Sequence, residues 1–224
     1  LPLLELYARM LTRRGAVAEA LRLFKLAVSH APDNASLRQQ LGLRHQLLGQ
    51  RGHAKICYQQ ALELASTHAE ARFCLGQMLM MESECKNGLE EYESRFALEP
   101  VNWQETPFPR WQGEALAGRH LFIWCEQGLG DIIMFAGFLP YLLKQAGRIT
   151  LRAPKKLLPI LQRSFPQVAL LPQTHAPMPE GFSCDFAMPL GDVLRHCLPH
   201  YRPAEHPAYV VPHPALAEEA RQAL

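Results

Sequence analysis

A repeat of period 34 runs through the first hundred residues, and it constrains the fold more than any other feature. When the sequence is aligned with itself at a shift of 34, small and aromatic residues recur in register: Ala8, Gly42 and Gly76; Ala20, Ala54 and Gly88; Phe24, Tyr58 and Tyr92. Small residues allow two helices to approach closely, and an aromatic ring fills the gap between neighbouring helices. The pattern therefore predicts three stacked helix pairs.

The expected helix pairs are Leu3–Arg14 with Ala16–His30, Ala35–Leu48 with His53–Ala65, and Ala69–Met81 with Lys86–Ala97. Gly15 and Gly49 are predicted to supply the turns within the first two pairs. Pro32 and Pro100 each close a repeat, where a proline stops a helix.

The period and the small, aromatic and proline positions resemble the tetratricopeptide repeat, with units at about 1–34, 35–68 and 69–100. The sequence departs from that pattern at Arg38, Arg72, Ser66, Gly88 and Arg95. Departures concentrate in the last unit, as expected where a solenoid meets another domain.

The tetratricopeptide resemblance implies a concave groove lined by the first helix of each pair. Its candidate residues are Glu5, Arg9, Arg13, Gln39, Leu43, Gln46, Phe73, Gln77 and Met80. One interpretation is a groove for an extended peptide or a partner protein. The alternative is that these residues are only solvated, with Phe73 and Met80 packing on the following domain. Charges of both signs occur here, so a simple electrostatic trap is not indicated.

The second half of the chain predicts an α/β region. Strands are expected at His120–Cys125, Arg148–Ala153, Val168–Pro172 and Cys184–Leu190, with helices after the first, second and last of them. This alternation implies a mostly parallel sheet covered on both faces. We expect a connecting segment at 101–118 anchored by Trp103 and Trp111, an α/β half-domain at 119–212, and a helix at 213–224.

The stretch from His120 to Leu143 reads as a buried strand that turns through glycines directly into one helix. Such a turn builds a binding crevice at the carboxyl edge of an open sheet. Asp131 stands at the start of the helix, so its carboxylate either caps the helix or points into the crevice. Asp192, after the last strand, is expected to cap a helix.

Spacing alone does not identify a ligand for this turn. Gly128 and Gly130 match the first two glycines of the dinucleotide fingerprint, but the third is absent, and no acidic residue ends the second strand. The nucleoside-triphosphate loop and the G-x-S-x-G esterase motif do not occur in the sequence.

The lead-in Trp111-Gln-Gly-Glu-Ala-Leu-Ala-Gly118, followed by Glu126-Gln-Gly-Leu-Gly-Asp131, resembles bacterial tetratricopeptide-repeat proteins that carry a glycosyltransferase domain. The turn and helix are also similar to the start of the lipopolysaccharide heptosyltransferases. The resemblance implies a GT-B enzyme, with a first Rossmann-like half that binds the acceptor and a second half that binds a nucleotide-sugar. The chain would carry the repeats and the first half only.

The same resemblance implies roles for individual residues. Asp131 corresponds to the base that removes the proton of the acceptor hydroxyl, a step that makes a sugar hydroxyl nucleophilic. The acceptor crevice would be formed by Glu126, Gln127, Gly128, Leu129 and Gly130. Met134 and Gly137 stand where many relatives carry a polar residue and an arginine, which puts the acceptor contacts or the activity itself in doubt.

Two functions follow as expectations. The first is the N-terminal part of a glycosyltransferase that transfers a sugar from a nucleotide-sugar to a protein or glycan, inactive by itself because the donor half is absent. Its partners would be the acceptor, the nucleotide-sugar, and a protein or peptide in the repeat groove, with no cofactor in this chain. The alternative is a non-catalytic scaffold in which the repeats bind a protein.

Composition narrows the remaining possibilities. The net charge of +2, with no block of Lys and Arg, gives no indication of nucleic-acid binding. No apolar run is long enough to span a membrane. Six scattered cysteines favour reduced thiols and a cytoplasmic location. His196, Cys197 and His200 lack further ligands at a metal-site spacing, so no metal is expected. The chain begins inside a helical pattern and ends in one, so we expect a fragment of a longer protein.

Overall fold

The computed structural model describes residues 1–82, 84–98, 106–174, 178–197, 208–215 and 217. The chain divides into two compact regions, Leu1–Pro100 and Val101–Leu224, which we call the repeat region and the sheet region. Trp103, His200 and most of the helix predicted at 213–224 lie outside the described residues.

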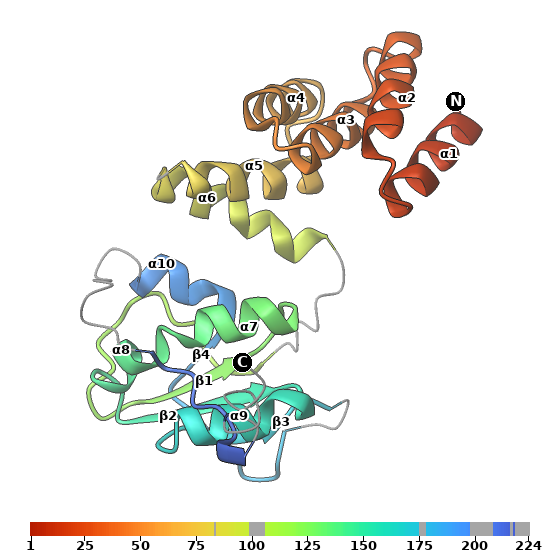
Figure 1. Ribbon diagram of the computed structural model, residues 1–224. Helices are drawn as coiled ribbons and strands as arrows, with labels where there is room; N and C mark the ends of the chain where they lie inside the picture. The colour runs from red at the N-terminus through yellow and green to blue at the C-terminus, as the bar shows by residue number, and fades with distance from the viewer. Residues whose placement is uncertain (83, 99–105, 175–177, 198–207, 216, 218–224) are drawn as a thin grey trace. The chain divides into compact units, whose positions relative to one another are not determined.

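The repeat region consists of helix pairs of the tetratricopeptide type, which confirms the solenoid predicted from the repeat period (Figure 1). Its helices are α1 (Pro2–Arg13), α2 (Val17–His30), α3 (Ala35–Leu47), α4 (Arg51–Leu64), α5 (Ala69–Met81) and α6 (Cys85–Tyr92), followed by the 3-10 helix η1 (Glu93–Ala97). The turns within the first two pairs use Gly15 and Gly49 at φ +82° and +72°, a conformation that glycine adopts without strain.

The backbones of the two helices approach each other very closely in the third pair, at Gly76 of α5 and Gly88 of α6. A Cβ on Gly76 would lie 2.8 Å from the carbonyl oxygen of Gly88, and a Cβ on Gly88 would lie 2.9 Å from that of Gly76. Gly88 departs from the repeat pattern, and this contact between the backbones of α5 and α6 is the physical reason, since even alanine is too large there.

The three arginines among the departures make side-chain contacts. Arg38 donates to Gln60 on α4 at 2.9 Å, and Arg72 donates to Glu91 on α6 at 2.8 Å, so each arginine joins the two helices of its pair. Arg95 stands at a position that is small in the other repeats, and its guanidinium lies 3.9 Å from the Phe96 ring centroid. The helix predicted as Lys86–Ala97 tightens into η1 around this side chain.

The sheet region is built on a four-stranded parallel sheet in the order β3-β2-β1-β4 (Figure 1). The strands are β1 (His120–Trp124), β2 (Arg148–Ala153), β3 (Ala169–Pro172) and β4 (Phe186–Pro189). The helices are α7 (Leu129–Ala136), α8 (Leu139–Leu143), η2 (Lys155–Leu157), α9 (Leu158–Ser164), η3 (Leu190–Asp192) and α10 (Val193–Cys197).

Successive residues of β1 point to opposite faces of the sheet and pack in two different hydrophobic cores. Leu121 and Ile123 of β1 pack with apolar side chains of α7, α8, α9 and α10. Phe122 and Trp124 face the other side of the sheet, where Phe182 and other side chains from loops cover them. Both faces are therefore covered, but in the described part of the chain the helices pack on one face and the loops on the other.

The helix that follows β1 is broken, whereas the sequence predicted one helix as far as Leu143. It ends at Ala136, and α8 begins at Leu139. Pro140 has no N–H to donate to the carbonyl of Ala136, so an α-helix cannot continue unbroken there. Gly137 at the break is buried against the ring of Tyr209: a Cβ on Gly137 would lie 2.8 Å from Tyr209 Cε1.

Candidate functional site

The carboxyl ends of β1 and β4 meet at one edge of the sheet, because the two strands are adjacent and parallel. From β1 the chain adds β2 and β3 on one side and β4 on the other. In open α/β sheets, ligands bind outside the carboxyl ends of the strands, where the strand order changes direction. The turn at 126–131 lies at this point.

The glycines of this turn leave its surface without side chains, and their backbone dihedral angles are ones that any residue can adopt. Gly128 is extended, with φ −64° and ψ 162°, and precedes the first residue of α7. Neither Gly128 nor Gly130 has a positive φ, in contrast to Gly15 and Gly49. Gly128, Leu129 and Gly130 are all exposed, and a Cβ on Gly130 would meet no atom within 4 Å.

Asp131 is exposed in the first turn of α7. Its Oδ2 lies 3.3 Å from the position that a Cβ on Gly128 would occupy, so the carboxylate folds back over Gly128. Among the described residues, no hydrogen bond to this carboxylate is found, and the N-cap of α7 makes no side-chain bond. The interpretation as a hydrogen-bonded cap therefore has no contact to support it.

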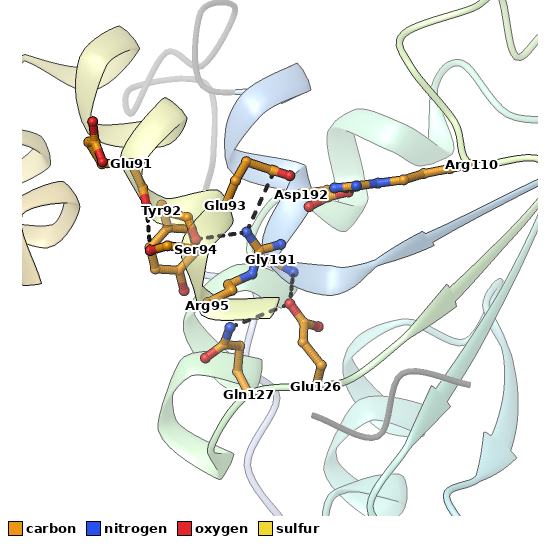
Figure 2. A network of polar contacts seen from close by, with 10 residues as sticks. All are labelled: Glu91, Tyr92, Glu93, Ser94, Arg95, Arg110, Glu126, Gln127, Gly191 and Asp192. Carbon is orange, nitrogen blue, oxygen red and sulfur yellow. Dashed lines mark hydrogen bonds and ion pairs between the residues drawn. The ribbon is translucent and has the colours of Figure 1, made fainter. Parts of the chain in front are cut away.

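Glu126 joins the ends of the two strands (Figure 2). Its Oε1 accepts a hydrogen bond from the backbone N–H of Gly191 at 3.0 Å and one from Gln127 Nε2 at 3.4 Å. Gly191 follows β4 directly within η3. Glu126 and Gln127 are half-buried, so they form the wall of the edge, while Asp131 stays accessible.

Arg110 is a site residue that sequence reasoning missed. Its Nε and Nη2 donate to Oδ2 of Asp192 at 2.8 and 2.6 Å (Figure 2). The Asp192 side chain is 2% exposed. Asp192, predicted to cap a helix, is thus the acceptor in an ion pair with Arg110. This ion pair holds the segment next to Gly191 in position. The only sequence signal for Arg110 was its place directly before the lead-in that starts at Trp111.

The lead-in packs as an additional edge beside β4. The N–H of Ala187 donates to the carbonyl of Pro109 at 2.9 Å, and Trp111 N–H donates to the carbonyl of Ala187 at 3.0 Å. Trp111 is buried, with its ring centroid 4.5 Å from that of His196 on α10. Burial lowers the pKa of His196, and the nearby Arg195 and Arg110 lower it further.

A pocket of about 460 Å³ lies elsewhere in the sheet region. Its lining includes Pro140 of α8, Lys144 directly after α8, Phe165 after α9, and Tyr209. No residue of the 126–131 turn contributes. The hydroxyl of Tyr209 donates to the carbonyl of Ile133 at 3.0 Å, which holds this segment against α7. The pocket is therefore separate from the edge where Asp131 lies.

In the repeat region, α1, α3 and α5 lie side by side. Arg44 of α3 donates from Nε to Thr12 Oγ1 of α1 at 3.2 Å, and Gln39 of α3 donates to Cys74 Sγ of α5 at 3.8 Å. These contacts form a row of first helices, and we call its solvent-facing side chains the first-helix row.

The predicted groove residues divide into two groups. Arg9 and Arg13 are exposed, and among the described residues neither has an ion-pair partner. The others contribute to packing or are partly covered. Gln39 is buried, Gln46 accepts a 2.6 Å bond from the Tyr58 hydroxyl, and Phe73 stacks on Tyr92 at 5.4 Å; Glu5, Leu43, Gln77 and Met80 are half-buried.

Two exposed residues of the row were missed, Leu47 and Met81, which are 54% and 60% exposed. They occupy the repeat position of Arg13, since each follows the previous one by a full repeat period, and this equivalence was the available signal. The row is thus basic over α1 and apolar over α3 and α5.

Arg44, a buried residue of α3, adds positive charge near Arg9 at the basic end of the row. It is buried, its guanidinium lies 4.2 Å from the Phe24 ring centroid, and its Nη1 donates to the carbonyl of Gln40 at 3.2 Å. Burial and the neighbouring charge of Arg9 lower its pKa to about 10, so it stays protonated at neutral pH.

The described residues contain no helix long and apolar enough to cross a membrane. In the same part of the chain, no three His, Cys, Asp or Glu side chains are grouped so that they could hold a metal ion.

Comparison with known proteins gives partial matches. No protein-family model matches the chain. Protein FlbA of Caulobacter vibrioides is 28% identical in an alignment of 193 residues that covers 67% of this chain and 32% of FlbA. The chain therefore spans about a third of that relative. The second tetratricopeptide-repeat domain of Spaghetti (RPAP3), solved with the HSP90 peptide SRMEEVD, is 14% identical, covers 43% of this chain and 89% of that one, and has a TM-score of 0.40. A crystal structure of MamA is 21% identical, with coverages of 44% and 57% and a TM-score of 0.39.

Proposed function

We propose that the repeat region binds an extended peptide segment of a partner protein along the first-helix row. The observation that carries this proposal is the pair of exposed arginines, Arg9 and Arg13, in line with the exposed apolar side chains of Leu47 and Met81. Unpaired cations attract carboxylates, and exposed apolar side chains at adjacent repeats gain by being covered. The favoured ligand therefore has apolar residues and an acidic end.

The test is fluorescence anisotropy with a labelled leucine-containing peptide that ends in glutamates, compared with the same peptide carrying glutamines. We expect Arg9→Glu with Arg13→Glu to weaken binding of the acidic peptide at least about tenfold, or about 1.4 kcal/mol. Arg22→Glu is the matched control, because Arg22 is exposed on α2, away from the row. If Arg22→Glu weakened binding as much as Arg9→Glu with Arg13→Glu, the first-helix row would not be the binding surface.

A second function is favoured by the sheet region: the acceptor-side half of a nucleotide-sugar-dependent glycosyltransferase with a Rossmann-like sheet. Its support is the strand order β3-β2-β1-β4, with the Glu126–Asp131 turn at the point where the order changes direction. The Asp131 carboxylate is exposed at this edge of the sheet and makes no capping hydrogen bond to any residue that the structure describes. A general base must likewise be accessible to the acceptor hydroxyl whose proton it removes. Asp131 would take the proton of the acceptor hydroxyl, while Glu126 holds the wall.

This second function is tested with Asp131→Asn in a polypeptide that extends past Leu224. Sugar transfer from a nucleotide-sugar should fall by about 10²–10⁴-fold, the usual range for loss of a general base. Asp33→Asn, an exposed aspartate in the loop between α2 and α3, should leave the rate unchanged. Transfer at the original rate by Asp131→Asn would eliminate the proposed base.

A further inference from the structure

Helix α1 carries an exposed apolar stripe. Leu3, Leu6, Tyr7 and Met10 are 82%, 57%, 54% and 45% exposed. Their spacing of three, four and seven positions places all four side chains on one face of the helix. Single exposed apolar residues are ordinary, but a continuous stripe along a helix indicates a contact surface.

The internal repeats show what covers this stripe in the other first helices. Leu37, one repeat period after Leu3, is 1% exposed, and Ala71, two periods after Leu3, is 0% exposed. Met78, at the position of Met10 in the third repeat, is 1% exposed. The same face is thus exposed in α1 and buried in α3 and α5.

In both buried cases the cover is the second helix of the preceding pair. Leu37 packs in a cluster with Phe24 of α2. On α5, Met78 clusters with Ala54 and Tyr58 of α4. The covering helices, α2 and α4, both present the small and aromatic residues of the repeat pattern. Each is joined to the helix that it covers by a short connection, at 31–34 and at 65–68.

We propose that the stripe on α1 binds the second helix of a further helix pair of the same kind, which precedes Leu1 in the same polypeptide. The stripe is apolar throughout, as is the face of α5 that α4 covers, so the occupant is a helix with the small and aromatic face of α4. Arg9 and Arg13 lie along one border of this stripe, since Arg9 is three positions after Leu6 and Arg13 is three positions after Met10. The inference rests on the apolar stripe alone and does not depend on either proposed function.

The test extends the chain with a copy of residues 35–68 placed directly before Leu1. This length preserves the register of the repeat, so the copied α4 is joined to α1 as α4 is joined to α5. Hydrogen exchange of the α1 amides is measured in the original and extended chains. Docking should slow exchange at these amides by at least about tenfold, since exchange of a terminal helix is governed by local opening.

Leu3→Glu with Met10→Glu should abolish the slowing in the extended chain. The matched control is Leu26→Glu, because Leu26 on α2 is also about half exposed, at 47%, but lies outside the stripe. Unchanged α1 exchange would overturn the proposal, and so would slowing that survives Leu3→Glu with Met10→Glu. A copied pair that adds no helical circular dichroism also counts against it. A dimer of the 224-residue chain in sedimentation, lost with Leu3→Glu, would replace the proposal with self-association.

Discussion

Replacing Gly76 with alanine tests the closest helix contact in the repeat region. The added Cβ would lie 2.8 Å from the carbonyl oxygen of Gly88 and 2.9 Å from the backbone nitrogen of Tyr92. Both atoms belong to the backbone of α6, so no rotamer change can relieve the overlap. The helices must separate, and the packing between α5 and α6 is lost in part.

The expected magnitude follows from two opposing effects. Alanine is favoured over glycine inside a helix by about 1 kcal/mol, whereas overpacking a close contact costs about 1–3 kcal/mol. Because two backbone atoms are approached to less than 3.0 Å, we place the cost at the upper end and expect Gly76→Ala to lower the free energy of unfolding by about 1–2 kcal/mol. Gly52→Ala is the control: Gly52 lies in α4, and its Cβ would meet nothing within 4 Å, so this variant should be neutral or more stable.

The two regions can be followed separately during urea unfolding. All three tryptophans, Trp103, Trp111 and Trp124, belong to the sheet region, so tryptophan fluorescence reports that region, while helical circular dichroism is dominated by the repeats. With a urea dependence of about 1–2 kcal/mol per molar, Gly76→Ala should move the helical midpoint down by about 1 M. The fluorescence midpoint should stay in place. A helical midpoint for Gly76→Ala at or above that of Gly52→Ala would refute the assignment of close packing.

Three further predictions concern the sheet region. Arg110→Ala leaves the buried carboxylate of Asp192 without this counter-charge and should lower stability by about 2–4 kcal/mol by tryptophan fluorescence; Arg110→Lys should recover only part, and full recovery would contradict a role for the two-donor geometry. Gly137→Ala displaces the ring of Tyr209 and should destabilise the region, less so when Tyr209 is already alanine, so additive effects in this double-mutant cycle would contradict the contact. Burial lowers the pKa of His196 from 6.5, so the unfolded chain binds its proton more readily. The stabilisation present above pH 6.5 should decline as the pH falls below that value, and His196→Gln should flatten the decline.

Local patterns were sufficient for much of the fold. The repeat period located the helix pairs, and Gly15 and Gly49 marked their turns, because short-range periodicity reports which face of each helix is buried. The strand Arg148–Ala153 agrees with the prediction residue for residue. The break near Gly137 was not predicted, because the apolar residues keep a helical spacing across Pro140 and that spacing does not report the missing N–H.

Side-chain partners far apart in sequence were not accessible in this way. Gln39 and Phe73 have groove positions in the repeat pattern, but the structure turns them to Cys74 and Tyr92. A period gives the face on which a residue lies, and it does not give the partner that the folded chain brings to that face. The roles of Asp131 and of the remaining groove residues stay predictions.

The sequence by itself determined the repeat architecture, the parallel strands and the position of the Glu126–Asp131 turn, because these depend on the spacing of apolar residues and glycines along the chain. Only the tertiary structure decided that Arg110 pairs with Asp192, 82 residues away, and that Glu126 holds Gly191 across the ends of two strands. Such contacts depend on strand order and register, which are set when the whole sheet assembles around its core.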